Sequence, residues 1–207
     1  MRTRLGPWLV VTGAGLVWLG HRGTDPATVA IYAGAFGAVL GAAFGVGADA
    51  DRAALVIALT HPSTPLAVAC GRWLAAALPA AGLAVACTLG VGGTARIALG
   101  GIATAAAVAG CALPAVLALG TGAALVLGSC LTIAGAAPPE DLVGFAEPGL
   151  ARVAAASVLE LGPALWRYRA VAERGAGNVG AILHAAGWAA LGVVLASGLV
   201  ARRIRAR

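Results

Sequence analysis

Six long apolar stretches occupy most of this chain, and the charged residues gather mainly between them and at the two ends. A helix needs about 20 predominantly apolar residues to cross the hydrocarbon core of a bilayer. The sequence LGTG separates the fourth stretch from the fifth. We therefore predict an all-α membrane protein with six transmembrane helices, at about residues 5–20, 27–47, 66–90, 97–118, 121–137 and 179–201.

The composition supports a bilayer as the solvent of this chain. Hydrophobic residues make up 60% and charged residues 11% of the 207 residues, and the mean hydropathy is +0.93. In a soluble domain, charged residues make up about 25%. A chain of this length forms one compact unit, so we expect residues 1–207 to be a single transmembrane domain.

All 14 basic residues are arginines, and this limits the chemistry that the chain can perform. Without lysine, the chain cannot supply the lysine of a P-loop ATP site or form a Schiff base with a carbonyl cofactor. We therefore expect that the chain is not itself an enzyme and binds no cofactor. Its net charge of +6 lies at chain ends and in loops, which favours a role in membrane orientation over nucleic-acid binding.

The other ionisable side chains and the cysteines point to no catalytic or metal site. The 8 acidic residues lie outside the predicted spans, whereas ion-coupled carriers usually keep such groups at membrane depth. The histidines fall in distant places, and we expect His184 to bond to a neighbouring side chain rather than to a metal. Inert buried thiols are expected at all four cysteines, which lie in apolar runs without a CxxC pair: Cys70, Cys87, Cys111 and Cys130.

The distribution of arginines predicts the orientation of the chain. With an even number of spans, both ends lie on one side of the membrane, and these ends read MRTR and ARRIRAR. Basic residues close to a span favour the cytoplasmic side. We therefore expect both termini in the cytoplasm and the long segment before the sixth span outside.

That outer segment, residues 138–178, contains apolar pieces that are too short to cross a bilayer. Such pieces are typical of re-entrant or interfacial helices. Its sequence WRYR combines aromatic rings with guanidinium groups, as expected at the headgroup boundary. Irregular backbone at membrane depth has to be covered by protein or face a water-filled cavity. We therefore predict an outer gate that includes Glu160, Pro163, Trp166 and Arg167.

The second predicted span carries glycines at four-residue spacing, namely Gly37, Gly41 and Gly45. A ridge of small residues lets another helix approach closely in lipid. The chain has 31 glycines, so this spacing also arises from composition alone. We predict a helix–helix contact at the ridge, either within the chain or with another subunit.

Between the second and third predicted spans lies the sequence ADADRAALVIALTHPSTPLAVACGRWLA. It begins with charged residues, continues as a short helix, stops at a proline and leads through Gly-Arg into the third span. This order resembles the cytoplasmic loop of ABC-2 type permeases, the transmembrane subunits of ATP-binding cassette exporters. The matching positions are Asp51-Arg52, Leu55, Ala58-Leu59, Pro62-Ser63 and Gly71-Arg72. The chain departs from the family pattern at Ala53-Ala54, where Gly-Thr is usual, and at Thr64-Pro65, where an arginine often stands.

The resemblance implies a coupling helix at about residues 51–60 that docks on a separate ATPase subunit. That subunit would bind ATP and Mg, and a second permease chain, identical or different, would complete the exporter in membrane lipid. The implied location is a bacterial or archaeal plasma (inner) membrane. The residues implied to contact the ATPase are Asp49, Asp51, Arg52, Leu55, Leu59, His61 and Pro62.

Two other functions stay open on the residues alone. A scaffold or anchor subunit of a larger complex would show the same hydropathy pattern without transporting anything. A secondary carrier is less favoured, because the predicted spans contain no carboxylate. The transported substrate is not readable from the sequence, although an interior without carboxylates suits hydrophobic or lipid-linked molecules better than ions.

Overall fold

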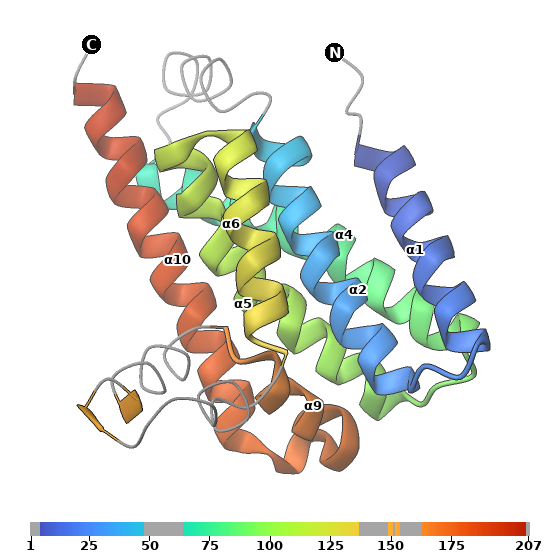
Figure 1. The fold of residues 1–207 in the computed structure, drawn as a ribbon. Helices are drawn as coiled ribbons and strands as arrows, with labels where there is room; N and C mark the ends of the chain where they lie inside the picture. The colour runs from blue at the N-terminus through green and yellow to red at the C-terminus, as the bar shows by residue number, and fades with distance from the viewer. Residues whose placement is uncertain (1–4, 48–63, 137–148, 151, 154–162, 206–207) are drawn as a thin grey trace.

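The computed structural model describes residues 5–47, 64–136, 149–150, 152–153 and 163–205. These residues are largely helical and contain no β-strand, which confirms the predicted all-α fold for this part of the chain. Figure 1 shows the helices arranged as a bundle. In chain order the elements are α1 (Leu5–His21), α2 (Pro26–Leu40), the π-helix η1 (Gly41–Val46), α4 (Pro65–Gly90), α5 (Ala95–Leu119), α6 (Thr121–Ala134), α9 (Leu165–Arg174), the 3-10 helix η3 (Gly175–Gly177) and α10 (Val179–Arg205).

Among the described residues, four helical segments are long and apolar enough to cross a membrane, namely α2 with η1, α4, α5 and α10. The helices α1 and α6 are also apolar but have only 17 and 14 residues. A helix therefore forms at each of the six predicted positions, and four of them have the length of a span. These four support an integral membrane protein, whereas a crossing by α1 and α6 stays a prediction.

Local chemistry explains several helix boundaries. Asp25 accepts a hydrogen bond from the backbone N–H of Thr28 at 3.3 Å, and Thr64 accepts one from that of Ala67 at 3.2 Å. Each cap is followed by a proline. Proline is suited to this position, because the backbone N–H that it lacks would have no acceptor within the first turn of the helix. The chain turns between α5 and α6 at Gly120, where φ is 86°, a conformation that favours glycine.

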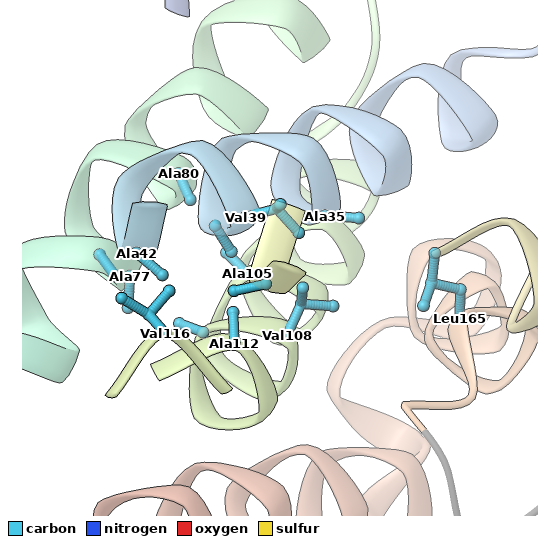
Figure 2. Packing of buried hydrophobic residues seen from close by; sticks show 14 of the residues in the cluster. Ala35, Val39, Ala42, Ala77, Ala80, Ala105, Val108, Ala112, Val116 and Leu165 are labelled. Carbon is cyan, nitrogen blue, oxygen red and sulfur yellow. The ribbon is translucent and has the colours of Figure 1, made fainter. Parts of the chain in front are cut away.

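Small side chains fill the centre of the bundle. Hydrophobic burial does not drive helices together in lipid, so their association depends on close van der Waals packing, which small side chains allow. The helix α5 is central, because it packs against α2, α4 and α10. Figure 2 shows the cluster that α2, η1, α4 and α5 build from alanine and valine, including Ala35, Val39, Ala42, Ala77, Ala80, Ala105, Val108, Ala112 and Val116.

Glycines mark very close helix approaches on two sides of α5. Gly192 of α10 lies directly against the carbonyl of Gly110 in α5, and a Cβ at either position would collide with the backbone of the other helix. Gly34 of α2 and Gly101 of α5 meet in the same way. The helix α5 is therefore held between α2 and α10 at positions that leave no room for a side chain.

The final part of the second span winds as the π-helix η1, in which the backbone N–H of Gly47 bonds to the carbonyl of Ala42. Turns of π-helix are rare and often occur at functional sites. This short element packs against α1, α4, α5 and α6. It is thus a junction of four helices just before residues 48–63, which lie outside the described part of the chain.

The two ends of the bundle differ. At the end that we call the terminal end, the beginnings of α1 and α4, the ends of η1 and α10 and the turn between α5 and α6 lie together (Figure 1). A buried cluster at this end joins η1, α4, α5 and α10 through Val46, Ala69, Leu113, Leu117, Ala196 and Val200. The helix α9 lies at the opposite end, which we call the α9 end (Figure 1).

Candidate functional site at the α9 end

The sites predicted from the sequence fall partly outside the described residues. This applies to Glu160 of the outer gate and to the whole set of coupling residues: Asp49, Asp51, Arg52, Leu55, Leu59, His61 and Pro62. The coupling helix therefore stays a prediction. The other predicted gate residues, Pro163, Trp166 and Arg167, lie together at the beginning of α9.

The helix α9 has one buried face and one exposed, charged face. Leu165, Tyr168, Val171 and Ala172 are buried, whereas Arg169 is exposed. Because the buried residues recur at three- and four-residue intervals, they lie on one side of the helix. This side packs mainly against α5, with further contacts to α10 and α2. The apolar face of α9 is thus covered by other helices of the bundle.

The beginning of α9 is fixed against the end of α6. The backbone N–H of Trp166 donates a hydrogen bond to the carbonyl of Gly135 at 3.1 Å, and Pro163 is buried nearby. The guanidinium carbon of Arg167 lies 5.1 Å from the centre of the Trp166 ring, which is a cation–π contact. The predicted mixture of aromatic and guanidinium groups therefore forms a direct contact in the structure.

A polar contact between aromatic side chains joins α9 to α10. Tyr168 is fully buried, and its hydroxyl oxygen lies 3.0 Å from Nδ1 of His184. Burial raises the pKa of Tyr168, the nearby Cys111 raises it further, and Arg167 lowers it. The phenol therefore stays protonated and can donate to the imidazole. This contact agrees with the prediction that His184 bonds to a neighbouring side chain.

Ionic contacts connect α9 to the beginning of α2. One guanidinium nitrogen of Arg169, Nη2, lies 3.0 Å from Oδ2 of Asp25, and its Nε lies 3.3 Å from Oε1 of Glu173. Its Nη1 also donates to the hydroxyl of Thr28 at 3.3 Å. The side chains of Arg169 and Asp25 are 50% and 47% exposed, so this pair contributes only about 0–1 kcal/mol to stability. It joins the exposed side of α9 to the beginning of α2.

The predicted glycine ridge lies on α2 and η1, away from the α9 end. A Cβ built on Gly37 would stand 2.9 Å from Cα of Ala80, and one on Gly41 would stand 2.7 Å from the carbonyl oxygen of Ala76. Gly45 has more room, since its nearest neighbouring atom is 3.5 Å away. The first two glycines therefore contact α4 of the same chain.

The contacts at the α9 end join α9 to α6, α10 and the beginning of α2. Among the described residues, no group of three or more His, Cys, Asp or Glu side chains could hold a metal ion.

Comparison of the chain with protein-family models, with curated proteins and with solved structures gave no match.

Sequence reasoning missed Asp25 as a member of this site, and it included Tyr168 and Arg169 only as part of the WRYR sequence, without their partners His184 and Asp25. Asp25 could have been found, because an aspartate directly before a proline and an apolar run is a typical N-cap. The pairings of Tyr168 and Arg169 with these partners carry no comparable signal. Asp25 and Arg169 are 144 positions apart, so no local pattern in the sequence relates them.

Proposed function

We propose that this chain is the permease subunit of an ABC-2 type ATP-binding cassette exporter. Residues 51–62 couple it to a separate ATPase subunit, which binds ATP and Mg, and a second permease chain completes the transport pathway. The proposal draws on the sequence resemblance of the segment between α2 and α4 and on the location of the two elements that flank this segment.

The observation that carries the proposal is that both flanks of the segment lie at the terminal end. Val46 at the end of η1 and Ala69 near the beginning of α4 belong to one buried cluster. Val200, in the last turns of α10 before the basic tail, belongs to the same cluster. When the basic tail is cytoplasmic, as its arginines predict, these flanks are cytoplasmic as well. An ATPase would dock on this side of the membrane.

The elements next to the segment are suited to passing on a movement. The π-helix η1 directly precedes the segment and contacts four other helices, while α4 follows it and packs against α2 and α5. A push on residues 51–62 would therefore reach most of the bundle through the contacts of η1 and α4. Protein interiors respond to such displacements by moving packed elements as units.

The α9 end also supports the proposal. The helix α9 has 10 residues, is too short to span a bilayer and lies just before the last long helix. Short helices at this position of the chain, on the side opposite the basic tail, are typical of the family that the sequence resembles. The contacts of α9 with α2 and α5 would link movements of the spans to the outer gate.

The test is purification of the tagged chain from the cells that make it, followed by identification of the proteins that remain bound. We expect an ATP-binding subunit to co-purify with the unaltered chain. Asp51→Arg combined with Arg52→Glu reverses both charges of the segment and should reduce this subunit at least tenfold. The matched control, Glu173→Arg with Arg174→Glu, reverses an adjacent acid–arginine pair on the exposed side of α9 and should leave the subunit bound.

Two outcomes would contradict the proposal. One is a stable complex that contains no nucleotide-binding protein, which would support a scaffold or anchor role instead. The other is equal loss of the ATPase subunit in both charge-reversal variants, because this would show that the 51–62 segment has no specific part in the contact.

A further inference from the structure

An open apolar groove runs along one side of the bundle between α1, α2 and α6. Its volume is about 580 Å³. Two tryptophans of α1 stand in its wall with about half of their surface exposed, 49% for Trp8 and 57% for Trp18. The other lining residues are apolar, aromatic or glycine apart from two hydroxyl side chains, and they include Thr12, Phe36, Leu125 and Ser129.

The length of the groove fits one acyl chain of a lipid. It extends along α1 from Trp8 to Leu19, which corresponds to about 16 Å at the helical rise per residue. One leaflet of the hydrocarbon core is about 15 Å thick. The groove therefore matches one extended acyl chain in length.

Charge at one end of the groove fits the headgroup of such a lipid. The guanidinium carbon of Arg22 lies 5.1 Å from the centre of the Trp18 ring, at the end of α1 where the chain leaves the apolar region. The nearby carboxylate of Asp25 is bonded by Arg169. Within the described residues Arg22 forms no salt bridge, so its positive charge is available to an anion.

We propose that this groove is a binding site for one acyl chain of an anionic bilayer phospholipid, with the headgroup held by Arg22. The apolar wall excludes water from the chain, and a phosphate-bearing headgroup pairs with a guanidinium that has no carboxylate partner in the described structure. This site is independent of the proposed export function, because it requires neither an ATPase nor a second permease chain.

The glycines of the helices provide a sharp test. A Cβ at Gly15 would meet no atom within 4 Å, and this glycine lines the groove, so Gly15→Phe fills the groove without displacing the backbone. Gly82 of α4 also has open space around it and does not line the groove, so Gly82→Phe is the matched control. Ser129→Leu reduces the groove from the side of α6 and serves as a second variant.

The measurement is native mass spectrometry of the detergent-purified protein titrated with phosphatidylglycerol and, separately, with phosphatidylcholine. We expect one phosphatidylglycerol to be retained by the unaltered chain and by Gly82→Phe, and at least tenfold less by Gly15→Phe and Ser129→Leu. Arg22→Gln should lower retention of phosphatidylglycerol to the level of phosphatidylcholine. The same spectra report the oligomeric state of each variant.

Equal retention of phosphatidylglycerol by Gly15→Phe and the unaltered chain would overturn the proposal. So would a change of oligomeric state in Gly15→Phe with unchanged lipid retention, because a second chain would then be the occupant of the groove. Equal retention of the two lipids by the unaltered chain would contradict the role of Arg22.

Discussion

At the scale of single residues, glycines decide how closely the helices of this bundle approach one another. Gly110 and Gly192 let α5 and α10 meet at the backbone, whereas Gly187 and Gly198 of α10 face open space. The sequence around these four glycines does not distinguish them, yet two of them lie at a helix contact and two face open space. The difference lies only in which side of the helix faces a neighbour.

Gly192→Ala is expected to destabilise the protein, because its Cβ would collide with the carbonyl of Gly110 and force α5 and α10 apart. Overpacking of this kind costs about 1–3 kcal/mol. Gly198→Ala adds the same methyl group where nothing lies within 4 Å and should change stability by at most about 0.5 kcal/mol. Thermal unfolding of the purified protein, followed by tryptophan fluorescence, measures both. A Tm of Gly192→Ala equal to that of Gly198→Ala would show that the helices do not meet there.

Tyr168 provides a second residue-level prediction, because burial raises its pKa above the ordinary value of 10.0. In the unfolded chain the phenol loses its proton near pH 10, while the folded protein still holds it. Stability is therefore fully present below pH 10 and falls as the pH rises above it. We expect Tm to fall less between pH 9 and pH 11 in Tyr168→Phe than in the unaltered protein.

At neutral pH, Tyr168→Phe should also cost about 1 kcal/mol through the lost hydrogen bond to His184. Tyr32→Phe is the matched control, because the Tyr32 ring is only partly buried and stacks on Phe36 with 5.9 Å between ring centres. At neutral pH its Tm should stay close to that of the unaltered protein. If the Tm of Tyr168→Phe fell as much between pH 9 and pH 11 as that of the unaltered protein, burial of the phenol would have no bearing on the alkaline loss of stability.

At the scale of elements, α9 depends for its position on its packing against the other helices of the bundle. It contributes four buried side chains and depends on α5 to cover them. The contact is possible because α5 has a glycine, Gly100, where the two helices meet. A Cβ at this glycine would lie 2.8 Å from Cβ of Ala172 and 2.9 Å from the carbonyl oxygen of Tyr168.

Gly100→Leu should therefore displace α9 from the bundle. In a chain whose four cysteines are replaced by alanine, Ala172→Cys introduces a thiol at a position that is only 4% exposed. We expect Gly100→Leu to raise the rate of labelling of this thiol by a water-soluble maleimide at least tenfold. Gly180→Leu is the control at the same end, since the nearest atom to its Cβ is 4.0 Å away. Equally slow labelling in both variants would mean that α9 does not depend on Gly100.

At the scale of the whole molecule, the four long helices run between two ends of the bundle that differ in chemistry. The terminal end gathers the flanks of the coupling segment and the last turns of α10, and the α9 end gathers the exposed charges of α9. Figure 1 shows the beginning of α1 and the end of α10 at the same end of the bundle. We therefore expect the two ends to lie on opposite sides of a membrane.

Labelling with a membrane-impermeant maleimide tests this assignment. In the cysteine-free chain, Arg174→Cys lies at the α9 end and Arg202→Cys near the end of α10, and both positions are exposed. We expect the thiol at position 174 to react in intact cells and the thiol at position 202 to react only after permeabilisation. Reaction of both thiols under the same condition would contradict the arrangement, and reaction of position 202 alone would reverse the predicted orientation.

The sequence by itself determined where the helices lie along the chain. In lipid, the backbone N–H and C=O groups of a long apolar stretch can be satisfied within a single helix. Predicted and observed helices agree to within three or four residues, and the turn at Gly120 falls in the predicted LGTG break. Only the tertiary structure decided which faces of the helices touch. In a membrane, faces toward lipid and faces toward protein are both apolar, so the polar–apolar periodicity that identifies a packing face in a soluble helix is missing. The pairs Gly110–Gly192, Asp25–Arg169 and Tyr168–His184, and the groove beside α1, arise from that choice of faces.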